Sequence, residues 1–398
     1  MHILIIAQFF PPDFGGASTR AYNAAKGLAL QGCKVTVVCG FPHYPHGKIP
    51  SKYCGKFFVN ECMDNINLIR TWVPSVPHTS NFNRLRSHFG FAFSSFFGTL
   101  KIKNFDIIIS MNPNLFSFLP SLLCHYIRRR EIIRNVDDLW PELFYDLGIV
   151  KSNFLKKILD FFALKSYKIP KMIIPVSEGY IPTIVNKYKI PKSKITVIEH
   201  GVDTKKFFPV KNINKHQKII MYSGAINIGY DFDLILNCAK ILEHENIKFV
   251  IRGIGNLAES IEKNIYDNSL SNVHLDTVLV DTKKLVEILN SADIFLLPMS
   301  KIKGIDTGLP TKILEYQAMG KPIVCVSDNE AGRYIEKTKS GLVTSSRDPK
   351  ILADLILQLV NDEKLSENLG LNGLKHVQKN LTIDAIGKHF LSVIQKII

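Results

Sequence analysis

Residues 308–324 read GLPTKILEYQAMGKPIV, and this stretch decides the fold. Pro310 suits the first turn of a helix, whereas Gly320 and the proline two residues later end that helix before a short apolar run. Lys312 falls near the start of the helix, and Glu315 about one and a half turns in. A helix that leads directly into a buried strand is typical of a parallel α/β sheet, whose ligands bind at the carboxyl ends of the strands. The stretch therefore predicts a ligand site at such an edge.

Short apolar runs alternate with helical patterns along the rest of the chain. Each run is nearly continuous in apolar residues, as parallel strands buried on both faces are. The expected strands are 3–7, 34–39, 106–110, 132–135, 172–176, 195–199, 218–223, 248–252, 273–276, 294–298, 323–326 and 341–344. Helices are expected between them, for example over 18–30 and 153–168. The pattern predicts an α/β fold with two βα-repeating sheets.

Two domains are expected because 398 residues exceed what one hydrophobic core usually serves. A charged turn between a glycine and a proline, HGVDTKKFFP at 200–209, marks the join. We predict an N-terminal domain over 1–200 and a C-terminal domain over 201–380. Residues 381–398 have the apolar spacing of an amphipathic helix that packs against another element.

The net charge of +15 is concentrated in the first 200 residues, where 25 Lys and Arg face 12 Asp and Glu. The remaining residues hold 25 basic and 23 acidic side chains. A strongly basic half predicts an anionic partner, which is nucleic acid, an acidic lipid surface or a phosphorylated substrate. Charge that merely keeps the protein soluble is the alternative. The absence of a zinc-finger pattern, an RNP-like motif or a basic helix argues against nucleic acid.

The cysteines and the first residues indicate the compartment. Seven cysteines form no CxxC pair, which argues against a zinc ribbon and a disulfide scaffold and favours a reducing, cytoplasmic location. The first apolar run stops at Gln8 without a basic region before it or a cleavage site after it, so it predicts a strand rather than a signal peptide. The sequence contains no uninterrupted run of about 18 apolar residues, so no membrane span is predicted.

Two glycine patterns are candidate phosphate sites. Gly15 and Gly16 follow the first strand and precede a helix, where backbone amides can approach phosphate oxygens, although an ordinary turn is the alternative. Gly253, Gly255 and Ala258 spell GxGxxA, with an aspartate at 276, the fingerprint of a dinucleotide enzyme. That fingerprint follows the second strand of its sheet rather than the first, where it belongs.

Two charged pairs also have alternative interpretations. Asp231 and Asp233 form a DxD pair that can hold a divalent ion, but they lie where a helix begins, and capping explains acidic residues there better. Glu315 can accept both ribose hydroxyls, and Lys312 can reach a phosphate; taken alone, the two are equally a solvated pair.

Several motifs together resemble the family 4 glycosyltransferases of the GT-B fold, which consists of two Rossmann-like domains with a cleft between them. The motifs are FGGAST at 14–19, VIEHGVDTKKFFP at 197–209, MYSGAI at 221–226, FVIRGIGN at 249–256, ADIFLLP at 292–298 and LEYQAMGKPIV at 314–324. VDDLWPEL at 136–143 further resembles a subgroup that transfers amino sugars such as N-acetyl-L-fucosamine into bacterial surface polysaccharide or O-antigen.

The resemblance implies roles for particular residues. Glu315 matches the second glutamate of the EX7E motif, which holds the nucleotide ribose. The nucleotide is expected mainly in the C-terminal domain, with Gly308, Leu309 and Thr311 also in contact, and Gly15 and Gly16 on the donor from the other domain. The acceptor is expected mainly in the N-terminal domain, to which the final helix crosses back.

The chain departs from the family pattern at three places. Thr307 replaces the first glutamate of the motif, with an aspartate beside it at 306. Ala225 replaces the arginine after the SG of the second sheet, and Tyr230 stands near the place of the missing lysine. An Asp-Asp pair ending at Asp138 replaces the usual His-Asp.

These departures shape the expected chemistry. A departing nucleotide diphosphate gains negative charge, and preorganised cations stabilise it. We expect Lys312 and Arg252 to do so, with Lys301 or Lys303 beside them. In this retaining family the leaving phosphate accepts the acceptor's proton, so Asp138 is expected only to orient the acceptor. Neither a metal nor a cofactor is expected; the donor is a nucleotide sugar, expected to be a UDP-sugar.

A basic, aromatic segment at 70–103 suggests where the acceptor is presented. Its members are Arg70, Arg84, Arg86, Lys101, Lys103, Trp72, Phe82, Phe89, Phe91, Phe93, Phe96 and Phe97. Such a segment suits an anionic membrane surface carrying a polyprenyl-diphosphate-linked saccharide, on the inner face of the plasma membrane; core aromatics with solvated charges are the alternative. The competing functions are a dinucleotide-dependent enzyme and a non-catalytic module that binds membrane or nucleic acid.

Overall fold

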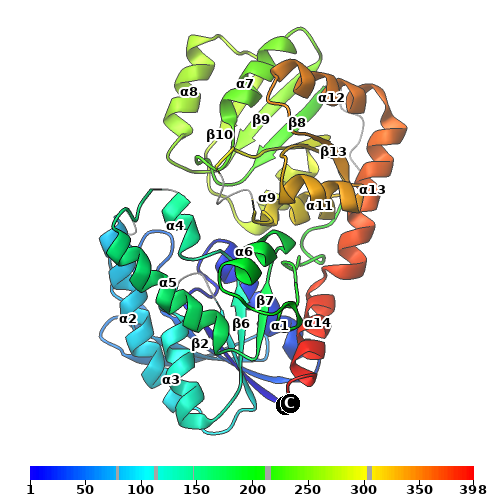
Figure 1. Cartoon of the computed structure of the whole chain (residues 1–398). Helices are drawn as coiled ribbons and strands as arrows, with labels where there is room; N and C mark the ends of the chain where they lie inside the picture. The colour runs from blue at the N-terminus through cyan, green and yellow to red at the C-terminus, as the bar shows by residue number, and fades with distance from the viewer. Residues whose placement is uncertain (78–79, 112–114, 147, 211–216, 303–306) are drawn as a thin grey trace. The chain divides into compact units, whose positions relative to one another are not determined.

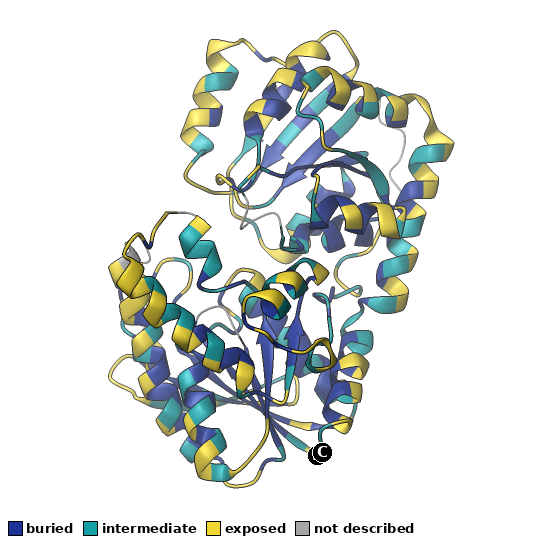
Figure 2. Cartoon of the chain, viewed as in Figure 1, coloured by how far each residue is buried: buried dark blue, intermediate teal, exposed yellow. Residues whose placement is uncertain are grey.

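The computed structural model describes residues 1–398 except 78–79, 112–114, 147, 211–216 and 303–306 (Figure 1). The chain divides into two compact units. The N-terminal unit comprises Met1–Gly201 and Ile383–Ile398, and the C-terminal unit comprises Val202–Thr382. Buried residues gather on the strands and the inward faces of the helices in both units (Figure 2). Each unit therefore has a core of its own.

The sheet of the N-terminal unit, as far as the chain is described, has the strand order β3-β4-β2-β1-β5-β6-β7. All neighbours are parallel except β3 and β4, which form an antiparallel hairpin. The strands are β1 His2–Ala7, β2 Lys34–Gly40, β3 Phe58–Met63, β4 Ile66–Thr71, β5 Ile107–Ser110, β6 Ile132–Val136 and β7 Met172–Pro175. The first five predicted strands are confirmed, and the β3–β4 hairpin was not predicted.

Helices cover both faces of this sheet (Figure 1). They are α1 Gly16–Leu30, α2 Asn81–Leu100, α3 Phe118–Arg128, α4 Glu142–Asp146, α5 Asn153–Lys168, α6 Ile181–Asn186 and α14 Ile383–Gln395, with single 3-10 turns at Ser51–Tyr53, Glu178–Tyr180 and Lys192–Lys194. Along the sheet, the step from β1 to β2 goes in one direction, and the steps from β5 to β6 and β7 go in the opposite direction. Because the crossovers are right-handed, α1 lies on one face of the sheet, and α3 and α5 lie on the other. Helix α2 packs against α3. In the described part of the chain no helix is long and apolar enough to cross a membrane.

Helix α14 brings the end of the chain back to the N-terminal unit, where it packs along α1. The two helices approach so closely that a Cβ on Gly27 would lie 2.5 Å from the carbonyl oxygen of Ile383. A Cβ on Gly387 would lie 2.2 Å from the carbonyl oxygen of Gly27. Both glycines are therefore required for this contact, since any side chain would separate the helices.

The predicted strand at 195–199 is wrong. An isolated bridge joins this segment to β7 at Ile173. The amides of Thr196 and Ile198 donate to the carbonyl oxygens of Ile173 and Pro175, but Pro175 has no N–H to donate in return, so the ladder stops. The buried guanidinium of Arg20, on α1, donates to the carbonyl oxygen of Ile198 at 2.7 Å and to that of Glu199. The segment therefore pairs with β7 only in part, and a side chain satisfies the carbonyl groups at its end.

His200, at the end of this segment, makes stability depend on pH. Burial lowers the pKa of His200 to about 3, from 6.5, and the Arg20 charge acts in the same direction. Between these values the unfolded chain binds a proton that the folded chain excludes, so stability falls as the pH falls below 6.5. We expect His200 to cost ~2 kcal/mol at pH 5 relative to pH 7.5. Urea unfolding of wild type and His200→Gln at both pH values measures this; an equal pH dependence in the two proteins would refute it.

The sheet of the C-terminal unit has the order β10-β9-β8-β11-β12-β13 in the described residues, with every pair parallel. The strands are β8 Lys218–Ser223, β9 Ile247–Arg252, β10 Val273–Asp276, β11 Ile294–Pro298, β12 Ile323–Val326 and β13 Gly341–Thr344. All six were predicted. Strand order reverses between β8 and β11, and α/β sheets bind ligands at the carboxyl ends of strands at such a switch point.

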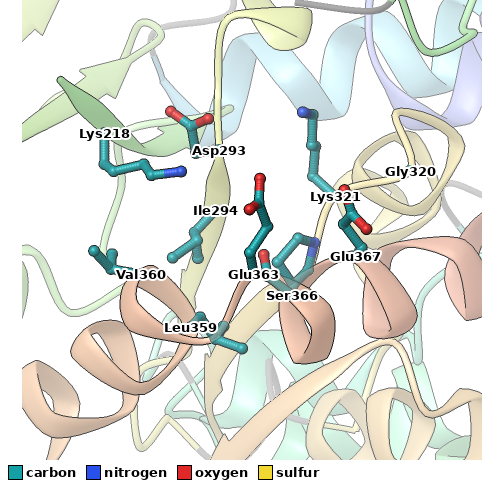
Figure 3. Close-up of a pocket in the computed structure, with 11 residues that line it drawn as sticks. Lys218, Asp293, Ile294, Gly320, Lys321, Leu359, Val360, Glu363, Ser366 and Glu367 are labelled. Carbon is teal, nitrogen blue, oxygen red and sulfur yellow. The ribbon is translucent and has the colours of Figure 1, made fainter. Parts of the chain in front are cut away.

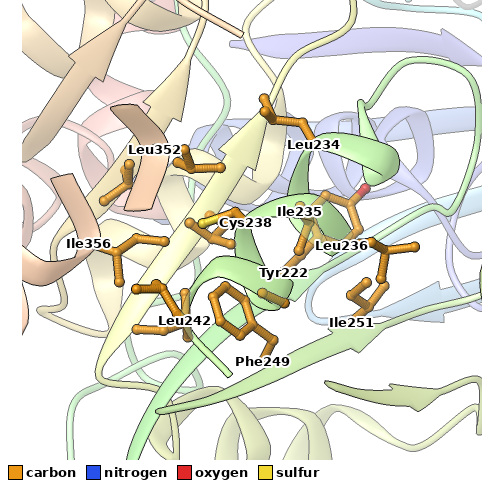
Figure 4. Close-up of a cluster of buried hydrophobic side chains, with 14 of the residues drawn as sticks. Tyr222, Leu234, Ile235, Leu236, Cys238, Leu242, Phe249, Ile251, Leu352 and Ile356 are labelled. Carbon is orange, nitrogen blue, oxygen red and sulfur yellow. The ribbon is translucent and has the colours of Figure 1, made fainter. Parts of the chain in front are cut away.

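Helices and apolar side chains fill out this unit. The helices are α7 Phe232–Ile241, α8 Ala258–Asp267, α9 Thr282–Asn290, α10 Thr311–Ala318, α11 Glu330–Thr338, α12 Pro349–Asn361 and α13 Glu363–Asn380. Side chains from β8, β9, α7 and α12 form one buried cluster that includes Tyr222, Phe249 and Ile356 (Figure 4). This core packs beneath the strands that meet at the switch point. Helix α10 follows β11, one of these strands.

Candidate functional site

Lys312, on α10, lies over the carboxyl end of β8. Its Nζ donates to the hydroxyl of Tyr222 at 2.6 Å. The same atom lies 3.6 Å from the ring centre of Tyr230 and 4.2 Å from that of Tyr222, so two aromatic faces hold the buried amine. Burial lowers the pKa of Lys312 well below its ordinary value, and Glu315 opposes that shift. We call Lys312, Tyr222, Tyr230 and Gly224 the lysine cluster.

Gly224 leaves room for this amine. Its φ is 152°, and a Cβ there would lie 2.5 Å from Nζ of Lys312. Gly224 precedes Ala225, where the resemblance leads one to expect an arginine, and Tyr230 stands near the place of the missing lysine. Lys312 thus lies against the segment that lacks both cations. Tyr222 was not predicted as a site residue, because an aromatic residue in a buried strand is typical of the core.

Tyr316 fixes α10 against the sheet. Its hydroxyl accepts from the amide of Ser223 at 2.8 Å and donates to the carbonyl oxygen of the same residue at 2.9 Å. Its ring stacks on Phe295 of β11 with centroids 3.9 Å apart. Because Tyr316 lies one turn after Lys312, these contacts also set the position of the lysine at the end of β8.

Glu315 lies one turn after Lys312 on the same helix and is partly buried. Burial raises the pKa of Glu315 to about 7, and the charge of Lys312 opposes the rise. Within the described residues its carboxylate accepts no hydrogen bond and forms no ion pair within 4.0 Å. A carboxylate that is partly desolvated and lacks a protein donor is suited to accept hydroxyl groups of a ligand.

The loop before α10 carries the other predicted nucleotide contacts. Leu309 is buried, whereas Gly308 and Thr311, the first residue of α10, are partly exposed. Thr307, in place of the family's first glutamate, is also partly exposed. Lys303 and the aspartate at 306 lie outside the described residues, and Lys301 is exposed. The loop residues therefore precede Lys312 and Glu315 directly at the switch point.

Arg252, at the end of β9, has a protein partner for its charge. Its Nε lies 3.0 Å from a carboxylate oxygen of Asp276, and an Nη donates to the carbonyl oxygen of Val278 at 2.8 Å. Asp276 is the acidic residue that a dinucleotide site would use for ribose. Because the two residues neutralise each other, each is less available for a ligand than the sequence alone suggests.

Packing explains the glycines of the GxGxxA segment. A Cβ on Gly253 would lie 1.8 Å from the carbonyl oxygen of Gly224, and one on Gly255 would lie 1.8 Å from that of Ile226. The chain after β8 is hydrogen-bonded to the end of β9 and the residues that follow it. The amides of Gly224 and Ile226 donate to the carbonyl oxygens of Arg252 and Ile254, at 2.9 Å in each case. The close approach of these two backbones is enough to require glycine at both positions. A bound pyrophosphate is not needed to explain them.

The DxD pair lies at the start of a helix, as predicted, and its first member is the cap. Asp231 is the N-cap of α7, where its side chain accepts from the amide of Leu234 at 3.1 Å, and it pairs with Arg347 at 3.2 Å. Asp233 lies in the first turn. Among the described residues no group of three or more His, Cys, Asp or Glu side chains is arranged to hold a metal ion.

A pocket of this unit lies at the amino ends of the strands, on the other side of the sheet from Lys312 (Figure 3). It is lined by Lys218, where β8 begins, by Asp293 and Ile294 at the start of β11, and by Glu363 and Glu367 of α13. Asp293 already accepts from the amide of Ile219 at 2.8 Å. Because ligands of such sheets bind at carboxyl ends, this pocket at the amino ends is not the predicted site.

Gly15 and Gly16 lie in a shallow pocket of the N-terminal unit, after β1. Phe9, Phe14 and Tyr44 form its walls together with the two glycines. Gly15 has φ 99° and precedes α1, which begins at Gly16. The predicted turn between strand and helix is therefore present, with aromatic rings around it.

Asp138 follows β6 at its carboxyl end, and burial raises the pKa of Asp138 to about 6. Its neighbour Asp137 lies 3.8 Å from Nε of Arg20 and accepts from Asn135 at 2.6 Å. Asp137 therefore serves the buried arginine, and the orienting role of Asp138 stays a prediction. Asp138 belongs to the N-terminal unit, whereas Lys312 and Arg252 belong to the other.

A chain of buried polar side chains, which was not predicted, lies near the carboxyl ends of β1 and β2. Gln8 donates to the hydroxyl of Ser87 at 3.1 Å, and that hydroxyl lies 3.3 Å from Nε2 of His43. The His43 Nδ1 lies 2.7 Å from the carbonyl oxygen of Phe41, which only accepts, so Nδ1 carries the proton. Burial lowers the pKa of His43 to about 4, and the neutral ring accepts from Ser87.

The comparisons with known proteins concern both units. The family model for glycosyltransferase family 4 matches residues 14–206, and that for glycosyl transferases group 1 matches residues 203–376. A Campylobacter jejuni protein, N,N'-diacetylbacillosaminyl-diphospho-undecaprenol alpha-1,3-N-acetylgalactosaminyltransferase, is 28% identical over 287 residues, which are 69% of this chain and 72% of that protein. The Staphylococcus aureus capsular polysaccharide biosynthesis glycosyltransferase CapM is 23% identical over 235 residues, 56% of this chain and 60% of that one.

Solved structures support the fold. The Anabaena protein HepE, in complex with UDP and glucose, matches 99% of both chains with a TM-score of 0.68 at 12% identity. Because the two family models together cover residues 14–376, the dinucleotide enzyme and the non-catalytic module are no longer needed as explanations. The chain is a glycosyltransferase and belongs to family 4, with the GT-B fold.

Proposed function

We propose that the chain is a retaining hexosyltransferase that moves an N-acetylated amino sugar from a UDP-linked donor to a lipid-linked saccharide in surface polysaccharide or O-antigen synthesis. The observation that carries the proposal is the lysine cluster beside Glu315 at the switch point. A nucleotide sugar needs an acceptor for its ribose hydroxyls and a cation for its diphosphate. Helix α10 offers both groups one turn apart.

The names of similar proteins support the choice of substrates. The Campylobacter relative is named for transferring N-acetylgalactosamine to a sugar on undecaprenol diphosphate, and CapM for capsular polysaccharide. HepE, which has the same fold, was solved with UDP. The segment at 136–143 resembles transferases of amino sugars, as the Campylobacter relative is. These likenesses together favour a UDP-linked amino sugar and a polyprenyl-diphosphate-linked acceptor.

In the proposed reaction, the bond between the anomeric carbon and the β-phosphate oxygen breaks, and the acceptor's hydroxyl oxygen bonds to the same carbon. Lys312 stabilises the charge that develops on the departing diphosphate. The hydroxyl proton passes to that phosphate, and Asp138 orients the acceptor. Arg252 contributes less because Asp276 balances its charge. The cation from Lys312 lets us propose that the reaction needs no metal or cofactor.

We further propose that the enzyme works on the cytoplasmic, inner face of the plasma membrane as a peripheral protein. Supporting this location are the excess of 25 basic over 12 acidic residues before position 201 and the lipid-linked acceptor in the name of the Campylobacter relative. Nucleic acid is not part of the proposal.

A transfer assay tests the proposed function. Purified enzyme is incubated with UDP-N-acetylhexosamine and an undecaprenyl-diphosphate-linked monosaccharide, with and without EDTA, and the product is analysed by mass spectrometry and NMR. We expect the acceptor to gain one N-acetylhexosamine, with the α configuration of the donor and without loss of rate in EDTA. A β-linked product would contradict retention, and transfer only from other nucleotide sugars would contradict the proposed donor.

A further inference from the structure

Helix α2 has the reverse of the usual amphipathic pattern. The face that packs on the sheet is largely small and polar: Ser87, Ser94, Ser95 and Thr99 are fully buried there together with Phe91. Glycines let this face approach closely, since a Cβ on Gly90 would lie 2.3 Å from Pro74 and one on Gly98 would lie 2.8 Å from Thr71. The hydroxyls of Ser94, Ser95 and Thr99 donate to backbone or side-chain oxygen atoms nearby. Helix α2 therefore packs without using most of its aromatic residues.

Those aromatic residues form a stripe along the outer face of α2. Phe82 is 68% exposed and Phe93 59%, and Leu85, Phe89 and Phe97 are exposed as well. Intervals of three and four residues put them on one side of the helix. Phe93 and Phe97 also meet the exposed ring of Phe57, with centroids 6.4 and 6.3 Å apart. A contiguous apolar patch of this kind marks an interaction site.

Helix α5 carries a second stripe. Phe154 is 76% exposed and Phe161 56%, with Leu155, Ile158 and Phe162 beside them on the helix. Right-handed crossovers put α5 on the same face of the sheet as α3, and α2 packs against α3 (Figure 1). The two stripes therefore belong to one face of the N-terminal unit, opposite the face that α1 and α14 cover.

The charges beside these stripes are positive. Helix α2 contains no acidic residue, and the one aspartate of α5, Asp160, is paired with Lys187 at 2.8 Å. Lys165 lies 5.5 Å from the ring centre of Phe161, and Arg86 lies 5.9 Å from that of Phe82. Exposed aromatic residues with lysine and arginine around them are typical of surfaces that lie in the interfacial region of an anionic bilayer.

A second copy of the chain fits this surface less well. A twofold interface would bring the basic groups of one copy against those of the other, and the centres of protein interfaces are poor in lysine. Arg70, which the sequence predicted as part of this surface, is buried and pairs with Glu61 at 2.5 Å, so it does not belong to the surface. The alternative of core aromatics holds for Phe91, which is fully buried.

We propose that the exposed faces of α2 and α5, the aromatic-basic surface, seat the N-terminal unit in the headgroup region of a bilayer that contains anionic lipid. The proposal rests on the proposed function, in which a lipid-linked acceptor is presented at a membrane. It adds the surface that makes the contact, with α5 as a second anchor that the sequence did not indicate. Phenylalanine side chains enter the boundary of the acyl chains, and the lysine and arginine groups meet lipid phosphates.

Vesicle flotation tests the surface with matched double variants. The α2 variant is Phe93→Ser with Phe97→Ser, and the α5 variant is Phe154→Ser with Phe161→Ser. The control removes two exposed apolar residues of the C-terminal unit, Tyr266 and Leu371, in the same way. With phosphatidylcholine vesicles containing phosphatidylglycerol, we expect each of the first two variants to lose at least about tenfold in partitioning and the control to bind like wild type. Wild type should bind more weakly at high salt or to vesicles of phosphatidylcholine alone.

Two companion measurements separate the possible outcomes. A UDP-induced thermal shift equal to that of wild type shows that a variant is folded with an intact donor site. Flotation of both variants like wild type would overturn the surface, and so would a dimeric wild type that becomes monomeric in the variants while vesicle binding persists. Failure of the proposed function would instead appear as absent UDP binding or sugar transfer in wild type, whatever the flotation result.

Discussion

Replacing Lys312 with methionine is expected to lower kcat about a hundredfold, equivalent to ~2.7 kcal/mol of transition-state stabilisation. The charge of this lysine acts on the leaving diphosphate, and the two cations that the resemblance predicts nearby are replaced by Ala225 and Tyr230. The aliphatic part of methionine keeps the volume between the rings of Tyr222 and Tyr230. Steady-state sugar transfer with saturating donor measures the change.

The control for this variant is Lys240→Met, on the exposed side of α7. It should stay within about twofold of wild type, because an exposed charge far from the leaving group is screened by solvent. Thermal unfolding should show that Lys312→Met is at least as stable as wild type, since replacing a buried charge with an apolar group is often neutral or stabilising. A loss in kcat smaller than about tenfold, ~1.4 kcal/mol, would contradict the assignment.

Replacing Glu315 with glutamine is expected to weaken UDP binding about thirtyfold, equivalent to ~2 kcal/mol. The carboxylate can accept from both ribose hydroxyls, whereas glutamine offers one acceptor oxygen. The loss should be specific to the ribose: wild type should prefer UDP over 2′,3′-dideoxy-UDP by a larger factor than Glu315→Gln does. Isothermal titration calorimetry measures all four affinities.

The raised pKa of Glu315 adds a pH signature to the same experiment. Because burial raises this pKa to about 7, lowering the pH from 8 to 6 converts the carboxylate into an acid that accepts less well. UDP affinity of wild type should therefore fall over this interval, and that of Glu315→Gln should change less. Equal affinity of wild type for UDP and its dideoxy analogue would place the ribose elsewhere.

The fold was predictable where apolar continuity marks a buried parallel strand. Every strand of the C-terminal sheet was found in this way. The β3–β4 hairpin was missed because neither strand is a continuous apolar run: β3 is a partly exposed edge strand, and β4, although largely buried between β3 and β2, mixes polar and apolar residues. Its turn residues Asp64 and Asn65, both with positive φ, are a local signal for the hairpin. The segment at 195–199 was wrongly predicted because its apolar pattern is that of a strand, whereas Pro175 of β7 lacks the N–H that would continue the ladder. Arg20, about 180 residues away in sequence, binds the carbonyl groups at its end instead.

The candidate site was predictable in part. The motif at 308–324 indicated Lys312 and Glu315 because its proline and glycine residues mark where the helix begins and ends beside a buried strand. Tyr222 could not be predicted as a site residue, because its role depends on a contact with Lys312, 90 positions away in sequence. Arg252 was predicted as a cation for the diphosphate, but its charge is paired with Asp276. Asp276 lies on the neighbouring strand, and sequence spacing does not reveal that the two side chains meet.

The most direct test of the central claim, that α10 holds a nucleotide diphosphate at the switch point, is a thermal-shift panel of UDP, GDP, NAD and a short DNA duplex on wild type and Lys312→Met. At 100 times its dissociation constant a ligand stabilises a protein by about 2.7 kcal/mol. We expect a thermal shift of wild type with UDP, a smaller shift of the variant, and no shift with NAD or DNA. A shift with NAD alone would contradict it.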